Sequence, residues 1–193
     1  MAKIKIGIVG CGGIANGKHF PALKNFTDRM EIVAFCDIVP ERAEKAAAEF
    51  GSTAKVYTDY RELIANPEVE VVYVLTPNVS HCEITVCAFE AGKHVFCEKP
   101  LGTDVAQCKA AEKVIEAHPD LIFQLGFMRR FDKSYAEAKR KIDNGDIGKV
   151  VLVRSYTQDP RSTIESTLKF APHSGGQYLD MCVHDIDLIR WFT

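Results

Sequence analysis

Short strand-like runs alternate with helix-like stretches through most of the chain, and this alternation limits the possible folds more than any other feature. Runs rich in β-branched and aromatic residues lie at 4–9, 31–37, 69–77, 94–98 and 121–127. Helix-like stretches separate them, such as the alanine-rich segment that begins at Pro40 and stops at Gly51. This pattern predicts an α/β domain, in which a parallel sheet carries helices on both faces.

The pattern changes after residue 127, so we expect one domain at 1–127 and the beginning of a second, different domain at 128–193. The second part contains a charged helix-like stretch, a long run of alternating apolar and polar residues that predicts a strand, a stretch of loop composition, and an apolar helix. These segments lie at 135–145, 149–159, 160–176 and 176–192.

Composition excludes several classes of function. The net charge is −2 and the basic residues are dispersed, so no nucleic-acid partner is expected. The longest strongly apolar runs are strand-sized, as at 71–75, which is too short for a membrane span, and the opening residues lack a secretory signal. Seven scattered cysteines without a C-x-x-C pair predict reduced thiols in a cytoplasmic protein, with no metal site.

The segment GIVGCGGIA joins the first strand-like run to a helix. Gly10, Gly12 and Ala15 form the pattern G-x-G-x-x-A, in which glycine permits a positive φ and the close approach of a pyrophosphate. The following helix offers free N–H groups at its N-terminus. A tight turn that binds nothing has the same pattern. The strand–turn–helix context, with an acidic residue at the end of the second strand, favours a dinucleotide site.

That acidic residue is Asp37. A carboxylate in this position accepts hydrogen bonds from the adenosine ribose hydroxyls and repels a 2′-phosphate, so it predicts NAD rather than NADP as the cofactor. Arg42 could favour a 2′-phosphate, but it lies inside the next helix, where a surface position accounts for it.

Polar residues also follow the next two strand-like runs. Thr76, Asn78 and His81 come after the third run, and Glu98 and Lys99 come after the fourth. Ligands of open α/β sheets bind beyond the carboxyl ends of the strands, so these side chains are expected at the cofactor crevice. Ordinary roles in a turn or helix cap for His81, or at the surface for Lys99, are the alternatives.

The last sixteen residues, YLDMCVHDIDLIRWFT, place polar groups on an apolar helix. Asp180, His184 and Asp187 are spaced by four and three positions, which would align them on one stripe. Burying two carboxylates and an imidazole is costly unless each is paired or has a function. The stripe is therefore a candidate active site, in which Asp187 is expected to anchor the helix through a hydrogen bond.

Together GCGGIA, Asp37, TPN..H, EKP, GFMRRFD and GGQYLDMCVHDIDLIRW resemble the Gfo/Idh/MocA oxidoreductases, a family named for glucose–fructose oxidoreductase and inositol dehydrogenase. The motifs occur in order along nearly the whole chain, and several of them are most similar to the inositol 2-dehydrogenase branch. The resemblance implies a Rossmann domain followed by an α+β domain with a mainly antiparallel sheet.

The resemblance also implies the reaction, which is oxidation of a ring hydroxyl of an inositol or sugar to a ketone. His184 would be the general base, assisted by Asp180 and Lys99. The expected substrate contacts are Lys99, Arg129, Asp159, Asp180 and His184. A surface salt bridge is an equal alternative for Arg129. The expected cofactor contacts are Gly10, Gly12, Gly13, Ile14, Asp37, Thr76, Asn78, His81, Glu98 and Lys99.

Members of the family are considerably longer than this chain. We therefore expect the 193 residues to be part of a longer protein that assembles as a homo-oligomer, a dimer or tetramer. A dehydrogenase of a pyranose sugar and a non-catalytic NAD-sensing regulator are the alternative functions. A regulator has no need for Lys99, Asp180 and His184 together, so their joint presence favours an enzyme.

Overall fold

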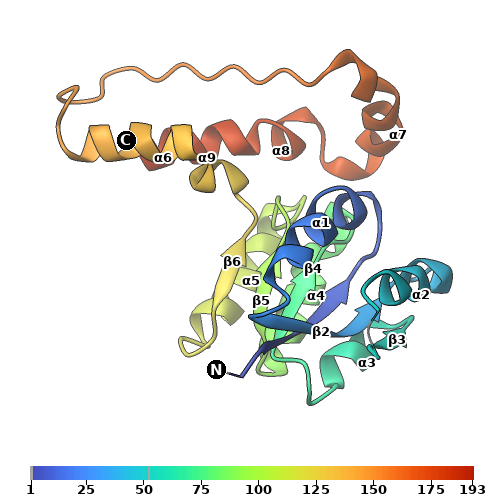
Figure 1. The fold of residues 1–193 in the computed structure, drawn as a ribbon. Helices are drawn as coiled ribbons and strands as arrows, with labels where there is room; N and C mark the ends of the chain where they lie inside the picture. The colour runs from blue at the N-terminus through green and yellow to red at the C-terminus, as the bar shows by residue number, and fades with distance from the viewer. Residues whose placement is uncertain (1, 52) are drawn as a thin grey trace. The chain divides into compact units, whose positions relative to one another are not determined.

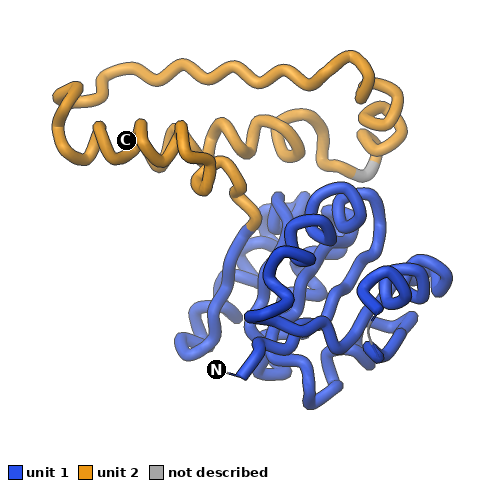
Figure 2. The backbone as a smooth tube through the Cα atoms, viewed as in Figure 1, with its two compact units in different colours: residues 1–125 blue, residues 126–193 orange. Residues whose placement is uncertain are grey.

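The computed structural model describes residues 2–51 and 53–193, apart from the side chain of residue 173. The chain forms two compact units, Met1–Leu125 (unit 1) and Gly126–Thr193 (unit 2), which Figure 2 shows in different colours. The division falls two residues before the boundary expected from the sequence.

Unit 1 contains a six-stranded parallel sheet with the order β3-β2-β1-β4-β5-β6, which confirms the predicted α/β class (Figure 1). The strands are β1 (Ile4–Val9), β2 (Met30–Cys36), β3 (Lys55–Tyr57), β4 (Val71–Val74), β5 (His94–Cys97) and β6 (Phe123–Leu125). The order reverses direction between β1 and β4, where open α/β sheets bind their ligands. Strand β3, a three-residue strand at the edge of the sheet, was not expected from the sequence.

Helices cover both faces of this sheet. One face carries α3 (Tyr60–Ala65), α4 (His81–Glu90) and α5 (Val105–Glu116). The other carries the π-helical turn η1 (Ala15–His19), α1 (Phe20–Leu23) and α2 (Pro40–Glu49). Two short 3₁₀ turns complete unit 1, η2 (Lys24–Phe26) and η3 (Asn78–Ser80).

Successive strand residues belong to opposite cores, as the two-residue period of a strand requires. In β4, Val72 and Val74 pack with Phe89 of α4, whereas Tyr73 between them joins the cluster that contains Phe20 and Phe35. A strand buried on both sides lacks polar alternation, which explains why these runs are apolar throughout.

All seven cysteines are free thiols, and several lie in these cores. Burial, the largest cause, raises the pKa of Cys11, Cys36 and Cys97 to about 12. These thiols therefore stay protonated near neutral pH and act as small apolar side chains.

Unit 2 is helical where it has regular structure. Its elements are η4 (Met128–Phe131), α6 (Lys133–Asp143), η5 (Arg161–Thr163), α7 (Ile164–Ser174), α8 (Gln177–Asp180) and α9 (Val183–Phe192). Helix α9 packs against α6 and η4, and α7 packs against α8. Among the described residues of unit 2, no strand is assigned.

Three segments of unit 2 differ from the sequence-based prediction. The expected strand at 149–159 is an extended segment without a hydrogen-bonded partner strand (Figure 1). Alternating apolar and polar residues favour an extended backbone, but a strand also needs a neighbouring strand to pair with. The expected loop at 160–176 contains the eleven-residue helix α7, in which the Glu165 carboxylate lies 3.0 Å from the Lys169 ammonium one turn away. The expected continuous helix at 176–192 is interrupted at residues 181–182.

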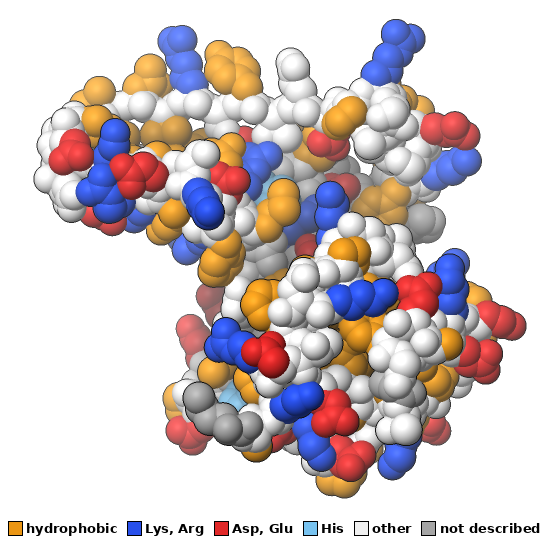
Figure 3. Space-filling view, viewed as in Figure 1, with side chains coloured by type: hydrophobic (Ala, Val, Ile, Leu, Met, Phe, Trp, Pro, Cys, Tyr) orange, Lys and Arg blue, Asp and Glu red, His pale blue; other side chains and the backbone are white. Residues whose placement is uncertain are grey.

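The surface carries both signs of charge. On the face of unit 1 visible in Figure 3, basic and acidic side chains are interspersed, in keeping with the small net charge. Across 2–51 and 53–193, no helix has both the length and the apolar character that crossing a bilayer requires.

Candidate functional site

The carboxyl ends of β1, β2, β4 and β5 lie side by side at one end of the strands in unit 1, which we call the carboxyl edge, because the strands are parallel neighbours. The loops and the first helical residues that follow these strands contain the cofactor residues expected from the sequence. They are Gly10, Gly12, Gly13, Ile14, Asp37, Thr76, Asn78, His81, Glu98 and Lys99. The structure thus gathers these ten residues on the edge where the strand order reverses.

The glycine loop after β1 is shaped by two different requirements. Gly10 has φ of +97°, and a Cβ there would lie 2.6 Å from the carbonyl oxygen of Leu75, so only glycine fits between β1 and β4. A Cβ on Gly12 or Gly13 would meet nothing within 4 Å. Gly10 therefore serves the fold, whereas the backbone at the next two glycines faces open space that a ligand can approach.

Asn16, in the turn after the loop, holds the loop backbone in place. Its side-chain amide donates to the carbonyl oxygens of Cys11 at 2.7 Å and Gly12 at 2.8 Å. Ile14 precedes η1 and is 40% exposed, so this apolar side chain of the loop is partly open to solvent.

Asp37 is more deeply involved in the fold than the sequence indicated. One carboxylate oxygen accepts the Cys11 N–H at 2.8 Å and the other accepts the Val39 N–H at 2.9 Å, while the Arg42 guanidinium lies 3.8 Å away. Asp37 is only 7% exposed. The carboxylate thus ties the glycine loop to the end of β2, and Arg42, which was expected at the surface alone, is its ionic neighbour.

The loop after β4 is fixed by a buried histidine. His81 is fully buried, and its ring nitrogens each lie 2.7 Å from a carbonyl oxygen, that of Pro100 at Nδ1 and that of Thr76 at Nε2. The Ser80 hydroxyl donates to the Thr76 hydroxyl at 2.7 Å. His81 therefore bridges the loops after β4 and β5, and these contacts account for it without a ligand.

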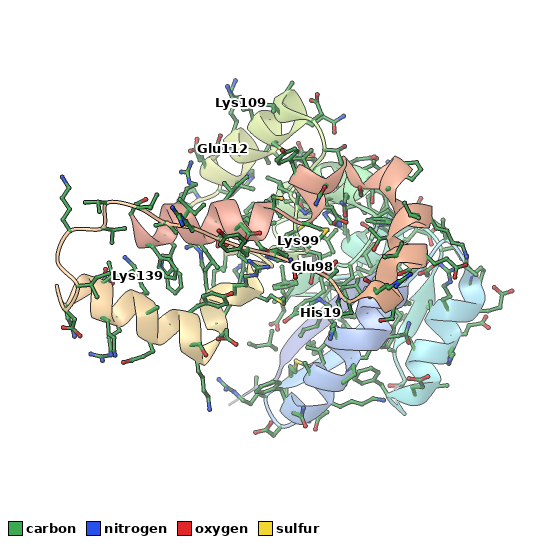
Figure 4. All side chains as sticks on the ribbon, turned by 90° about the horizontal axis from the view of Figure 1, so that it is seen from above. His19, Glu98, Lys99, Lys109, Glu112 and Lys139 are labelled. Atoms are coloured by element: carbon green, nitrogen blue, oxygen red, sulfur yellow. The ribbon has the colours of Figure 1, made fainter. Side chains whose placement is uncertain are left out.

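Glu98 and Lys99 follow β5, and the structure adds a residue that sequence reasoning missed, His19. The Nε2 atom of His19 lies 2.7 Å from one carboxylate oxygen of Glu98, and the Lys99 backbone N–H donates to the other at 3.1 Å. Figure 4 shows these three residues grouped together. No sequence signal joins His19 to Glu98, because 79 positions separate them.

The charge of Glu98 is set by its neighbours. Burial on its own would raise the pKa of this carboxyl group. The hydrogen bond from His19, the charge of His19, and the backbone N–H and ammonium of Lys99 outweigh burial and hold the pKa below its ordinary value. Glu98 is therefore ionised at neutral pH.

In unit 2, Arg129 is one member of a hydrogen-bonded cluster around Asp185. Its guanidinium donates to the Asp185 carboxylate at 3.0 Å and to the Thr157 hydroxyl at 2.9 Å. Thr157 and Ser155 also donate to Asp185. Burial favours a raised pKa for Asp185, but these donors hold it below its ordinary value. Arg129 thus forms a salt bridge, as the alternative for this residue proposed, but its partner Asp185 is largely buried and not at the surface.

The neighbouring Arg130 forms a second pair, with Asp187. The guanidinium donates to both carboxylate oxygens, at 2.9 and 2.6 Å, and lies over the Trp191 ring at 5.6 Å from its centroid. This hydrogen bond raises the pKa of Arg130. The prediction that Asp187 anchors its helix through a hydrogen bond is confirmed, because Arg130 belongs to η4 and Asp187 to α9.

The sequence suggested that Asp180 and His184 lie on one continuous helix, but the structure places them on two. Asp180 ends α8, His184 is the second residue of α9, and the chain turns at Met181 and Cys182 between them. The His184 ring lies edge-on to Phe127, with 6.4 Å between centroids. Asp159 lies just before η5 in the extended segment.

Comparison with known proteins agrees with this geometry. Residues 4–127 match the GFO_IDH_MocA oxidoreductase family with an NAD-binding Rossmann fold, and residues 135–193 match the GFO/IDH/MocA C-terminal domain. The chain belongs to this family.

Several curated relatives and solved structures are inositol dehydrogenases. Inositol 2-dehydrogenase of Salmonella typhimurium is 36% identical over 188 residues, 97% of this chain and 54% of the relative. The scyllo-inositol 2-dehydrogenase (NAD(+)) of Bacillus subtilis is 36% identical over 190 residues, 98% of this chain and 54% of the relative. The chain therefore spans about half the length of the curated relatives it matches.

Two crystal structures resemble the whole chain. Myo-inositol 2-dehydrogenase from Lactobacillus plantarum has a TM-score of 0.92 at 43% identity, covering 100% of this chain and 57% of that one. The scyllo-inositol dehydrogenase from Lactobacillus casei, with bound NAD(H) and scyllo-inositol, has a TM-score of 0.91 at 41% identity, covering 100% and 56%.

Proposed function

We propose that the protein is an NAD-dependent dehydrogenase that oxidises a ring hydroxyl of an inositol to a ketone. The observation that carries this proposal is the likeness, along the full chain, to a scyllo-inositol dehydrogenase with bound NAD(H) and scyllo-inositol. The open backbone at Gly12 and Gly13 supports it from the side of the structure, because a dinucleotide pyrophosphate needs such a close approach.

The cofactor is held by the carboxyl edge of the sheet in unit 1. The glycine loop from Gly10 through Ile14 and the following helical turn receive the pyrophosphate, and Asp37 faces the adenosine ribose. The buried carboxylate of Asp37 is the reason for a preference for NAD, since it would repel a 2′-phosphate. Thr76, Asn78, Glu98 and Lys99 are the remaining proposed cofactor contacts, and His81, whose ring is fully buried, is proposed to act there by fixing the backbone of these loops. When bound, the nicotinamide ring supplies the acceptor for the hydride that leaves the substrate carbon.

The chain's own residues manage the proton of the oxidised hydroxyl. His184 accepts this proton as general base, and Asp180 orients the imidazole and stabilises its charged form. The Lys99 ammonium stabilises the negative charge that develops on the same oxygen. The support for these roles is the correspondence of Lys99, Asp180 and His184 to the family's catalytic residues.

Arg129 and Asp159 are proposed to bind other hydroxyls of the polyol. A guanidinium has five N–H donors, and the contacts of Arg129 with Asp185 and Thr157 leave donors available. Loss of Arg129 should therefore raise KM for an inositol and also weaken the Asp185 cluster, whereas loss of Asp159 should affect KM alone.

We further propose that residues 149–159 join a mainly antiparallel sheet, and that the protein forms a cytoplasmic homo-oligomer, a dimer or tetramer. Exposed apolar side chains along this segment, 90% for Val151, 69% for Leu152 and 84% for Tyr156, support the part of this proposal in which other strands or a second subunit cover it. Light scattering after size-exclusion chromatography measures the assembly, and a monomer would contradict it.

The test of function is NADH formation by the natural protein with a panel of inositol isomers and pyranoses. We expect activity with an inositol, and a loss of about 10²–10⁴-fold in kcat for Lys99→Ala and His184→Ala with little change in NAD affinity. His118→Ala is the matched control, because His118 contacts a carbonyl of its own helical segment, that of Val114. Activity with pyranoses alone would favour the sugar alternative, and NAD binding without turnover of any substrate would favour a regulator.

A further inference from the structure

We propose that His19 is a positioning residue for Lys99 and acts through Glu98. This inference rests on the proposed function, in which Lys99 contacts the reacting oxygen. It assigns Glu98 a role within the chain, as the link between the turn after the glycine loop and the backbone of Lys99.

The carboxylate of Glu98 is divided between two donors. His19 Nε2 lies 2.7 Å from Oε1, and the Lys99 N–H lies 3.1 Å from Oε2 (Figure 4). An ionised carboxylate only accepts hydrogen bonds, so Nε2 of His19 must carry the hydrogen. The direction of the carboxylate, and with it the position of the peptide plane that begins Lys99, is therefore set by where His19 stands.

The ring of His19 is itself held by the sheet. It lies edge-on to Tyr73 of β4 and Phe96 of β5, with centroids 6.3 and 5.4 Å away, and these two rings stack on each other at 4.8 Å. The side chains of His19 and Glu98 are only 15% and 16% exposed. A ring fixed on an aromatic surface and bonded to a carboxylate has little freedom, which is what a positioning group requires.

Removal of His19 leaves a mostly buried carboxylate with one fewer donor. Such a group is costly to keep in place, so Glu98 should turn toward water or toward the Lys99 ammonium, and its hold on the Lys99 N–H should be lost. Because His19 ends the helical turn that follows the glycine loop, the proposed contact also ties the nucleotide-binding segment to the strand end that carries Lys99. A small displacement of Lys99 would then lower kcat without altering the cofactor loop.

The experiment compares His19→Ala, His19→Gln and Glu98→Ala with the control His118→Ala in the full-length protein. We expect His19→Ala to lower kcat for the inositol roughly 10²-fold, as misplacement of a catalytic group does, with a much smaller fall in NAD affinity, because Glu98 is one of several proposed cofactor contacts. Amide hydrogen exchange at Lys99 should become faster. His19→Gln, which keeps an N–H donor, should restore part of both readouts. Glu98→Ala should reproduce the loss of protection at Lys99, because alanine has no side-chain oxygen to accept the Lys99 N–H.

Hydrogen exchange at Lys99 needs no turnover, so it separates this inference from the proposed function. Absence of dehydrogenase activity in the unmutated protein would contradict the proposed function, and with it the role of His19 in turnover. Unchanged Lys99 exchange and unchanged kcat in His19→Ala, in a protein that is active, would overturn the inference alone. A fall in NAD affinity that matches the fall in activity would overturn it as well, because His19 would then be a cofactor contact. If His19→Ala fails to fold, His19→Gln and Glu98→Ala decide the same question.

Discussion

The buried apolar side chains of the two units differ in number and in arrangement. In unit 1 they form two clusters, one on each face of the sheet, whereas in the described part of unit 2 the buried apolar side chain is that of Leu188. The buried side chains of unit 2 also include Asp185 and Asp187, each paired with an arginine. Unit 1 thus depends mainly on hydrophobic burial, and unit 2 relies to a larger extent on charged hydrogen bonds.

Because of this difference, the two units should respond differently to a change in pH. Hydrophobic burial depends little on pH, whereas ion pairs require the ionised carboxylate. Conditions that protonate carboxylates should therefore loosen unit 2 by a route that does not apply to the apolar cores of unit 1.

The largest expected effect is the loss of a core aromatic side chain in unit 1. Phe35 is fully buried, and its ring lies 6.0 Å from that of Phe20 and 5.8 Å from that of Phe50. Phe35→Ala should lower the free energy of unfolding of unit 1 by about 3–5 kcal/mol. Amide hydrogen exchange in β1 and β2 measures this, while exchange in α9 should change much less. Equal loss of protection in both units would contradict the comparison.

A smaller effect is expected from Asp185→Asn in unit 2. The change removes the charge that accepts from Arg129 and Thr157, and a hydrogen bond to a charged group contributes about 1.5–3 kcal/mol. Exchange of the α9 amides should become faster, and β1 should be unaffected. Glu165→Gln is the control, because its pair with Lys169 is exposed by 84% and 75% and should contribute nothing measurable. Unchanged α9 protection in Asp185→Asn would show that the Arg129–Asp185 pair does not stabilise unit 2.

The same carboxylate predicts how unit 2 responds to acid. Since the pKa of Asp185 lies below its ordinary value of 3.8, its stabilisation is complete above that pH and is lost as the pH falls toward the folded-state pKa. Asp185→Asn should therefore flatten the pH dependence of α9 exchange below about pH 4. A profile identical to that of the unmodified chain would show that another group dominates.

Loss of a helix cap should have the smallest effect, and each unit offers one. The Asp104 side chain accepts the Gln107 N–H at the start of α5, and the Asp132 side chain accepts the Ser134 and Tyr135 N–H groups at the start of α6. Each change to alanine should cost about 1 kcal/mol in its own unit. Hydrogen exchange in α5 and α6 would report the two losses separately. A change confined to one of them would show that the caps are not equivalent.

Most of unit 1 could be predicted because buried parallel strands read as apolar runs and the glycine loop follows the first of them. Strand β3 could not, since KVY is too short to show a period. In unit 2, the spacing of Ile164 and Leu168 was a usable signal for α7 that the turn-forming residues around it obscured. No glycine or proline marks the break at Met181 and Cys182, so the pattern alone favoured one helix.

In the candidate site, too, some features could be predicted from the sequence and others could not. The sequence identified the loops at the carboxyl edge of the sheet, because motif and strand ends are local features. It did not reveal that Asp37 binds Cys11, that His81 bridges to Pro100, or that His19 binds Glu98. Each of these contacts joins residues far apart in the chain, and their pairing follows from the order of strands in the sheet.

The most direct test of the account is an NAD titration of the protein with alanine at Gly12. An added Cβ at Gly12 meets nothing within 4 Å of the chain, whereas one at Gly10 would lie 2.6 Å from the carbonyl oxygen of Leu75. If the glycine loop holds the dinucleotide, Gly12→Ala should keep the Tm and weaken NAD binding by at least about tenfold, or 1.4 kcal/mol. Gly10→Ala should instead lower the Tm. Unchanged NAD affinity in a stable Gly12→Ala protein would contradict the proposed cofactor site.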